Sequence, residues 1–595
     1  MIPERGKIWD INGTLLVSNN KNYRLLLNKG KYLSNKKILR EIQDFLDLDD
    51  EFFVESLIKI KNARNKSYVI LINNLNWGQI SKIETNIDRF DGVIIDLNHP
   101  RCYYYSTDIC HVIGYVRHTA TKEFDLANKN HQSKDEMFDM PSFIEISQLS
   151  QLINQNSQTI LTQKEILNNI GSLNLEMGIY GAEKQYNKIL FGKVGYIEIE
   201  ADATGKHVKE LSFSNSIQGK DMHMFLDINL QQIINKQLPD KSCCIVNKLE
   251  NNAILGMVSK PHFDSKILSN NITHHAWREI QKSNSLINRC IQGQYNPGSV
   301  FKLVTILSAL ENGIDPNFSC ICTSQPFLDK HFHCWNKFGH GRVKSMSEAL
   351  SKSCNHYMFK LAKHLSIEKI LSTARKFGFG SLTEIDLPHE KSGSIKFHNN
   401  KLTTLLMLSI GQGFITTTPI QIAKMISMIF NNGEYHKFKC ANNNLNLLKV
   451  NKIYTPENNV INFNKHLHIN EIINENIIDI KKWPKTFLEE HLDVLREGMY
   501  KSINSTSGNS YKNRLKSGLI LFGKTSTIQT VSRSQYSDKN KNHGMFAGYI
   551  SHEGVNYGIT VFIENGETGQ KALKVAGKIL TEYLLNKKHD TPQSK

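Results

Sequence analysis

The stretch from Gly293 to Gly313, GQYNPGSVFKLVTILSALENG, constrains the fold more than any other part of the chain. Apolar residues recur in it at helical spacing, which predicts the buried face of a helix: Val300, Leu303, Val304, Leu307 and Leu310. Pro297-Gly298 precedes this face, and a glycine follows it as a stop signal. The segment therefore predicts a helix with one buried face, and Ser299 and Lys302 lie in or beside its first turn.

The Ser299/Lys302 pair predicts a nucleophile and its base. Residues three apart on a helix are neighbours, so the Lys302 amine lies under the Ser299 hydroxyl. An ammonium that loses its water near the positive end of a helix has a lowered pKa, and its neutral form can accept the serine proton. The spacing alone carries little weight, because Ser18/Lys21 and Ser366/Lys369 share it.

A second hydroxyl-amide pair lies at Ser353-Cys354-Asn355. The segment SMSE, Ser345 to Glu348, has the pattern of a capping box and predicts a short helix ending near Ser353. Another helix is expected to begin around His356. In the loop between them, Ser353 and Asn355 can face the site while Cys354 faces away.

A third polar segment is GKTSTIQ, Gly523 to Gln529, which predicts a strand. Side chains alternate on a strand, so Lys524 and Ser526 should share one face and Thr525 and Thr527 the other. A cation and hydroxyls at a sheet edge suit a substrate carboxylate.

The rest of the chain predicts two domains. Apolar runs such as SYVILI (67–72) and GVIIDL (92–97), between polar connections, indicate mixed strands and short helices in residues 1–220. The polar stretch 200–222 has no apolar periodicity and is expected to be the connector between the two domains. Residues 221–588 combine helices with late strands (519–531, 544–563), a turn at 552–554 and a final helix, an α+β pattern. Residues 589–595 are expected to be a disordered tail.

Taken in order, the three motifs resemble the S-x-x-K, S-x-N and K-T-G triplets of the penicillin-recognising serine acyltransferases, the β-lactamase-like fold. The likeness extends to longer segments: LINRCIQGQYNPGSVFKLVT, HCWNKFGHGRV, FGFGSLTEIDLPHEKSG and SIGQGFITTTPIQIAKM resemble the class B, rod-elongation family of penicillin-binding protein 2. PERGKIWDINGTLL, HVIGYV and EKQYNKILFGKVG resemble its N-terminal pedestal, a dimerisation-type domain. The resemblance covers nearly the whole chain.

This resemblance implies a serine D-Ala-D-Ala transpeptidase that cross-links peptidoglycan stem peptides during cell elongation and is a target of β-lactams. The implied roles are nucleophile for Ser299, proton acceptor for Lys302, and proton relay and peptide holding for Ser353 and Asn355. Lys524, Thr525 and Thr527 would bind the terminal carboxylate, with Ser526 beside them. The backbone N–H groups of Ser299 and Thr527 would form the oxyanion hole. No cofactor is implied for the chemistry.

Two departures from the family stand out. Ser526 occupies the place of the K-T-G glycine, which normally lets the substrate backbone lie close to the strand. The alternative to an active enzyme is therefore a catalytically impaired, β-lactam-binding scaffold of the elongation machinery. Relatives also carry a membrane helix just before the P-x-R-G segment, so we expect the anchor to be missing from this sequence and the protein to act at the periplasmic face of the inner membrane.

Cysteine and histidine crowd into residues 320–354. Cys322, Cys334, His340 and Cys354 would complete a tetrahedral zinc site, with Cys320 as an alternative to Cys322. The resemblance also implies zinc, since some relatives hold it at this place. The competing interpretation is a group of buried free thiols. A bound zinc would be structural and would support the loop of Ser353 and Asn355 from behind.

Other functions fit the sequence less well. The net charge of +17 could favour nucleic acid, but no motif of a nucleic-acid-binding fold accompanies it, and we expect no nucleic-acid partner. A β-lactamase would need a deacylating base, and no E-x-x-L-N segment lies between Asn355 and Lys524. A sensor would need transmembrane coupling, and a bifunctional synthase a glycosyltransferase domain. The resemblance implies the rod-system membrane glycosyltransferase as a partner.

Overall fold

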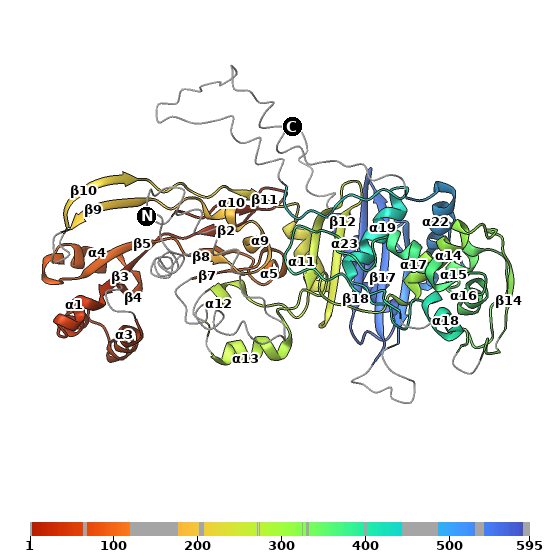
Figure 1. Cartoon of the computed structure of the whole chain (residues 1–595), viewed down its shortest axis with the longest axis horizontal. Helices are drawn as coiled ribbons and strands as arrows, with labels where there is room; N and C mark the ends of the chain where they lie inside the picture. The colour runs from red at the N-terminus through yellow and green to blue at the C-terminus, as the bar shows by residue number, and fades with distance from the viewer. Residues whose placement is uncertain are drawn as a thin grey trace, which may run out of the picture.

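The structure is a computed structural model that describes residues 3–63, 68–118, 176–201, 207–269, 272, 274–323, 325–328, 332–397, 401–442, 486–529 and 541–586. The molecule is elongated, with the N-terminal half at one end, a five-stranded sheet in the middle and a group of helices at the other end (Figure 1). The tail predicted at 589–595 lies outside the described residues.

The N-terminal half contains several small sheets, with strand orders β11-β1-β2-β6, β4-β3-β5, β7-β8 and β9-β10. The strands are β1 (Ile8–Trp9), β2 (Leu15–Asn19), β3 (Asn22–Asn28), β4 (Tyr68–Leu75), β5 (Val93–Asn98), β6 (Arg101–Tyr103), β7 (Val116–His118), β8 (Glu176–Gly178), β9 (Tyr196–Ala201), β10 (His207–Ser214) and β11 (Met222–His223). The helices are α1 (Lys29–Ser34), α2 (Ile38–Phe45), α3 (Asp50–Asn62), α4 (Trp77–Glu84), the 3₁₀ turn η1 (Ile87–Arg89), α5 (Cys110–Ile113), α9 (Gly181–Gln185) and α10 (Asn187–Phe191).

The apolar runs of this half form strands, as predicted. SYVILI supplies β4 and GVIIDL supplies β5, and both pair with β3 in antiparallel register. Their buried side chains pack with those of α2 and α4 in a core of their own. This sheet and its helices therefore form a separately packed unit at one end of the molecule (Figure 1).

The stretch 200–222, predicted as a connector between the domains, contains strands. Residues 207–214 form β10, which pairs with β9 as a long antiparallel ribbon, and β11 adds a parallel strand to β1. The later residues of β10 are largely exposed: Leu211 is 56% exposed and Phe213 54%. An exposed strand needs no alternation of apolar and polar residues, so this part of the sequence carried no strand signal.

The C-terminal half is built on an antiparallel sheet with the order β13-β12-β18-β17-β16. Its strands are β12 (Ser242–Lys248), β13 (Ala253–Ser259), β16 (Leu521–Ile528), β17 (His543–His552) and β18 (Val555–Ile563), and a smaller pair is β14 (Cys320–Cys322) and β15 (Gly341–Val343). The helices are α11 (Ile228–Gln237), α12 (Ser265–Ser269), α13 (His274–Ser283), α14 (Lys302–Glu311), α15 (Met346–Ser351), α16 (Asn355–Ala362), α17 (Ile367–Lys376), α18 (Leu402–Ser409), α19 (Pro419–Phe430), α22 (Glu489–Asn504) and α23 (Gly569–Asn586), with 3₁₀ turns η2 (Gly298–Phe301) and η4 (Tyr511–Asn513).

Alternation along the strands assigns the two faces of this sheet to different cores. Cys243 and Ile245 of β12 belong to the large core shared with α14, whereas Cys244 and Val246 pack with α11 and α23. The sheet is thus a middle layer between helices, which confirms the predicted α+β class. β16, which carries the K-T-S segment, is an edge strand.

The predicted hairpin near the C-terminus is confirmed. Glu553 and Gly554 connect β17 to β18, with φ angles of +49° and +75°. Two successive residues with positive φ are the requirement of a type I′ turn, whose twist matches that of the flanking strands.

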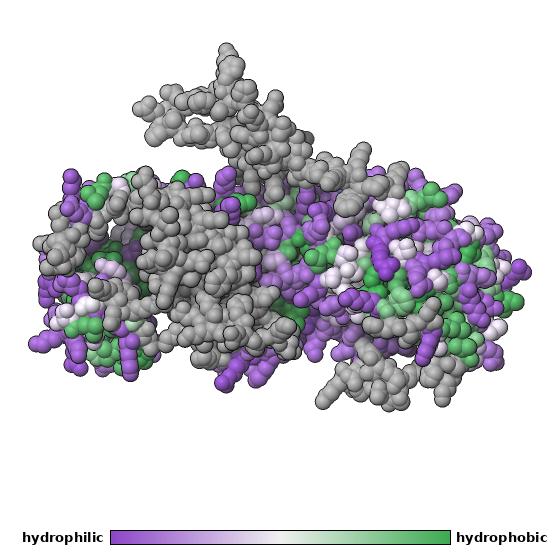
Figure 2. Space-filling model, viewed as in Figure 1, coloured by the Kyte–Doolittle hydropathy of each residue, from purple (hydrophilic) through white to green (hydrophobic). Residues whose placement is uncertain are grey.

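Hydrophobic and hydrophilic residues are mixed on the visible face, at both ends of the molecule (Figure 2). Within the described ranges, each helix is too short or too polar to cross a membrane.

Candidate active site

Ser299 lies in the short turn η2, one residue after a glycine that adopts a φ of +55°. The Gly298 N–H donates to the Gly411 carbonyl at 2.8 Å, and the Asn296 side chain donates to the carbonyls of Gly413 and Ile415. The turn is therefore held by the segment 411–415. The Ser299 side chain is half-buried.

The predicted helix begins two residues later than its first apolar position, Val300, because residues 298–301 take the tighter 3₁₀ winding. The predicted apolar face is buried, and so are the other residues from Lys302 to Leu310. The helix is thus central to its domain, with every side buried, where the sequence predicted one buried face.

Lys302 is fully buried, and its ammonium has polar partners in the loop of Ser353 and Asn355. Its Nζ donates to the Ser353 carbonyl at 2.8 Å, to Ser353 Oγ at 3.3 Å and to Asn355 Oδ1 at 2.6 Å. Burial lowers its pKa to about 8. A neutral amine is therefore accessible near physiological pH, which is what a base for a serine hydroxyl requires.

Ser353 connects Lys302 to Lys524. Its Oγ accepts hydrogen bonds from both amines, at 3.3 Å from Lys302 and 2.9 Å from Lys524. Lys524 is also fully buried, and its pKa is lowered well below the usual value by burial and then by the charge of Lys302. With both lone pairs of its oxygen occupied, the Ser353 hydroxyl has its proton free to donate elsewhere.

The loop geometry predicted for 353–355 is what the structure has. α15 ends at Ser351, α16 begins at Asn355, and Ser353 takes a φ of +52° between them. The side chains of Ser353 and Asn355 turn to Lys302, while Cys354 turns to the sulfur of Cys334 at 3.9 Å.

The K-T-S segment also shows the predicted alternation. Ser526 Oγ donates to the Pro297 carbonyl at 3.0 Å, on the side of the strand from which Lys524 reaches Ser353. On the opposite side, Thr525 Oγ1 lies 3.3 Å from Ser510 Oγ, and Thr527 Oγ1 accepts from the Gly569 N–H at 3.1 Å. Thr525 is buried and Thr527 exposed.

Sequence reasoning missed two residues that hold the site. Trp335 Nε1 donates to the carbonyls of Lys352 and Ser353, at 3.2 and 3.1 Å. Gly411 accepts from Gly298 and lies so close to it that a Cβ at 411 would be 2.3 Å from the Gly298 carbonyl oxygen. The signal for Trp335 was its place between Cys334 and His340, as one of five tryptophans in the chain.

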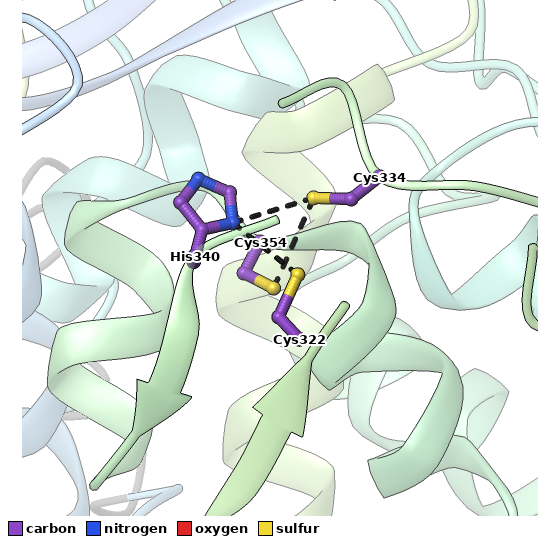
Figure 3. Close-up of side chains that lie close together, drawn as sticks. All are labelled: Cys322, Cys334, His340 and Cys354. Carbon is purple, nitrogen blue, oxygen red and sulfur yellow. Dashed lines mark hydrogen bonds between the residues drawn. The ribbon is translucent and has the colours of Figure 1, made fainter. Parts of the chain in front are cut away.

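The four predicted ligands Cys322, Cys334, His340 and Cys354 converge at the back of this loop (Figure 3). Their Sγ and Nδ1 atoms all lie within 4.8 Å of one another. Cys322 comes from β14, His340 from the residue before β15, and Cys354 from the N-cap of α16. In the described part of the chain, Cys320 is not a member of this group.

The spacing of these four atoms suits a tetrahedral zinc ion. Thiolates about 2.3 Å from zinc would lie ~3.8 Å apart, and a sulfur and a nitrogen ligand ~3.5 Å apart. The Cys334–Cys354 sulfurs are 3.9 Å apart, and His340 Nδ1 lies 3.5 Å from Cys322 and 3.4 Å from Cys334. The hydrogen bond from Cys354 lowers the pKa of the Cys334 thiol and favours its thiolate. The residues present fit the metal.

Two family models match the chain. Residues 242–584 match the penicillin binding protein transpeptidase domain, and residues 1–224 match the penicillin-binding protein dimerisation domain. The first match contains Ser299 and the other predicted site residues, and the second covers the small sheets of the N-terminal half.

Relatives and solved structures agree with these matches. The peptidoglycan D,D-transpeptidase MrdA of Acinetobacter baumannii is 27% identical, over 98% of this chain and 81% of the relative, and the protein of the same name from Escherichia coli K12 is 23% identical, over 98% and 87%. The penicillin-binding protein PBP2 of Helicobacter pylori, 25% identical, superposes with a TM-score of 0.70 over 98% of both chains. Its complex with MreC, 23% identical, gives a TM-score of 0.76 over 98% of both chains and so supports the fold. The chain therefore belongs to the penicillin-binding proteins with a transpeptidase domain, in the branch of penicillin-binding protein 2.

Proposed function

We propose that this chain cross-links peptidoglycan by D,D-transpeptidation, with the acyl group carried on Ser299. The observation that carries the residue assignment is the Ser353 hydroxyl, held between the buried amines of Lys302 and Lys524 in the domain that bears Ser299. Buried lysines joined through one hydroxyl are costly for a fold, because each charge loses its hydration, and such groups are characteristic of catalytic sites.

In the first half-reaction, Ser299 Oγ attacks the carbonyl carbon between the two D-alanines of a stem peptide. Neutral Lys302 takes the hydroxyl proton as the oxygen–carbon bond forms. The N–H groups of Ser299 and Thr527 stabilise the oxyanion, and each donor contributes roughly 3 kcal/mol. The carbon–nitrogen bond then breaks, the leaving D-alanine amine receives a proton through the Ser353 hydroxyl, and an ester remains on Ser299.

In the second half-reaction, the amine of a neighbouring stem peptide attacks this ester. Its proton passes to the base, the carbon–oxygen bond breaks, and Ser299 regains its proton. The product is an amide cross-link, so atoms balance without a cofactor.

The terminal carboxylate of the donor peptide would lie along the edge strand β16. Lys524 supplies an N–H donor beside this strand, and Thr527 is exposed, with its oxygen accepting from the Gly569 N–H and its hydroxyl proton available to a ligand. Thr525 was predicted to share this role, but its hydroxyl is buried against Ser510. We therefore assign Thr525 to the support of the strand.

Fluorescent penicillin tests the assignment. Wild-type protein should become labelled at one site, found on Ser299 by peptide mapping, and Ser299→Ala should lose the label. Slow release of the bound antibiotic separates a transpeptidase from a β-lactamase. Folded wild-type protein that takes up no label would contradict the proposal. The comparisons do not favour the alternative, a catalytically impaired, β-lactam-binding scaffold.

We also propose a structural zinc ion on Cys322, Cys334, His340 and Cys354. Its contribution would be to fix β14, the turn before β15 and the N-terminus of α16 to one point, which sets the pose of Ser353 and Asn355. Purified wild-type protein should contain one zinc per chain, and Cys334→Ser should contain none. Zinc-free wild-type protein purified without chelator ends this proposal.

The remaining assignments are proposals by similarity. The membrane-anchored periplasmic location and a rod-system glycosyltransferase partner are proposed from the resemblance to this branch. The domain division at 220/221 is proposed from the polar stretch 200–222. The Helicobacter pylori relative is solved with MreC, and a similar partner is proposed for the N-terminal half of this chain. Co-purification of full-length protein with each candidate partner, compared with a chain lacking residues 68–98, would test the contact.

A further inference from the structure

Ser526 makes a side-chain hydrogen bond that the glycine of the K-T-G motif could not make. Its side chain is 1% exposed, and its Oγ donates to the carbonyl oxygen of Pro297 at 3.0 Å. The two residues are 229 positions apart in the chain. The hydroxyl is thus turned into the protein, toward the segment that precedes Ser299.

This hydrogen bond fixes one end of the Pro297–Gly298 peptide unit. The other end is fixed as well, because the Gly298 N–H donates to the Gly411 carbonyl at 2.8 Å. Gly298 has a φ of +55°, in a region that glycine enters and leaves without steric cost. Because both ends of this peptide unit are held, rotation about the backbone bonds of Gly298 is restrained. That rotation sets the direction of the Ser299 N–H.

The same bond joins the two backbone segments that carry the proposed oxyanion donors. Pro297 is two residues before Ser299, and Ser526 is one residue before Thr527. η2 and β16 pack directly against each other. A single side-chain hydrogen bond thus links the two backbone segments whose N–H groups would bind the oxyanion.

We infer that Ser526 is a positioning residue that sets the separation and aim of the two oxyanion donors, Ser299 N–H and Thr527 N–H. The inference rests on the proposed function and deepens it. Ser526 replaces a glycine without closing the substrate edge, because its hydroxyl is directed to Pro297. Gly298 is its steric counterpart: a Cβ at 298 would lie 2.3 Å from Ser526 Oγ.

Ser526→Ala tests the role by removing the hydroxyl alone. Stopped-flow acylation by penicillin should show a rate constant for ester formation lowered about tenfold, with the dissociation constant of the prior non-covalent complex unchanged, because misplaced donors affect the transition state. A boronic acid that forms a tetrahedral adduct on Ser299 should lose affinity by the same factor, since its oxygen occupies the oxyanion position.

Ser242→Ala is the matched control. Ser242 is buried on β12 of the same sheet and also donates its hydroxyl to a proline carbonyl, that of Pro239. Both variants should lower the melting temperature by similar amounts. Only Ser526→Ala should lower the acylation rate and the boronate affinity, which separates positioning from general stability.

A coupled pair tests the contact itself. Gly298→Ala should be nearly inactive, because its methyl group would lie 2.3 Å from Ser526 Oγ and 2.9 Å from Ile528 Cγ1, at a φ of +55° that strains any side chain. Adding Ser526→Gly removes the first of these contacts and should restore a small part of the acylation rate. Wild-type acylation kinetics and boronate affinity in Ser526→Ala would overturn the inference. Failure of the proposed function is distinguishable, because the wild-type protein would then take up no penicillin.

Discussion

Lys302 and Lys524 share one acceptor, the hydroxyl of Ser353, and neither side chain reaches solvent. Two ammonium groups bonded to the same hydroxyl repel each other, because the protein interior screens charge poorly. Burial also disfavours the charged form of each amine. The site therefore favours a state in which at least one amine is neutral. When Lys302 is the neutral amine, it can act as the proposed base for Ser299.

The pH dependence of acylation follows from this. The pKa of Lys302 is lowered to about 8, so its neutral fraction grows as the pH rises through that value. Because the neutral form is the active one, the acylation rate constant should rise from about pH 6 to about pH 9 and level off above the pKa. Stopped-flow labelling at constant ionic strength measures the profile. Lys302→Arg should be inactive across the range, whereas a flat wild-type profile would exclude Lys302 as the base.

At the scale of elements, the loop between α15 and α16 is held in a strained form from two sides. Ser353 has a φ of +52°, a conformation that costs a non-glycine residue about 1 kcal/mol or more. Its carbonyl accepts from both Lys302 and Trp335, and the next residue, Cys354, joins the cluster of Cys322, Cys334 and His340. These contacts keep the loop in place where its own sequence would not.

Trp335→Phe should loosen this loop. The substitution keeps an aromatic ring but removes the N–H that reaches the Lys352 and Ser353 carbonyls, so we expect acylation about fivefold slower, the equivalent of one ordinary hydrogen bond. Trp9→Phe, which removes an indole N–H donated to Asp221, is the control and should acylate normally. Equal rates in both variants would show that the indole contact is dispensable.

Removal of the proposed zinc should act on the same loop. Chelation should lower the melting temperature and slow acylation together, because the N-terminus of α16 loses its link to β14, and added zinc should restore both. Cys334→Ser should reproduce the chelated state, whereas Cys102→Ser, on β6 and outside the cluster, should not. Unchanged acylation in a protein shown to be zinc-free would disprove the support role.

At the scale of the whole molecule, the two halves share packing and polar contacts. One core extends from Ile8 of the first sheet to Phe562 of β18. Tyr186, between α9 and α10, donates to Asp386 Oδ2 at 2.6 Å, and that carboxylate also accepts the N–H groups of Cys440 and Ala441. The N-terminal half is therefore fixed to the transpeptidase half at a loop away from the lysine pair.

Tyr186→Phe should weaken this connection. Loss of a hydrogen bond to a carboxylate should lower the free energy of unfolding by about 2 kcal/mol, with acylation by penicillin unchanged. Tyr104→Phe removes a hydroxyl contact with Ser18 inside the N-terminal half and should have a smaller effect, because Tyr104 is half exposed. Thermal unfolding followed by calorimetry measures both. Acylation that slows in Tyr186→Phe alone would mean that the contact also affects the site.

Local pattern was sufficient for much of this protein. The apolar spacing after Ser299, the alternation in the K-T-S strand and the turn at Glu553-Gly554 predicted α14, β16 and the β17–β18 hairpin. The strand β10 escaped prediction, because its exposed residues, such as Leu211 and Phe213, follow no periodic pattern. The S-x-x-K spacing was equally uninformative by itself: Ser366 caps α17 through the Lys369 N–H.

The sequence by itself determined which residues carry the chemistry and in which elements they lie, because helix and strand periods are set by neighbouring residues. Only the tertiary structure decided that Lys524 meets Ser353 across 171 positions and that Ser526 turns to Pro297 rather than to a ligand. Such contacts depend on how the sheet edge packs against η2 and α14. In that packing, a buried hydroxyl or amine turns to the acceptor that lies nearest to it. The residues next to it in the sequence do not show which acceptor this will be.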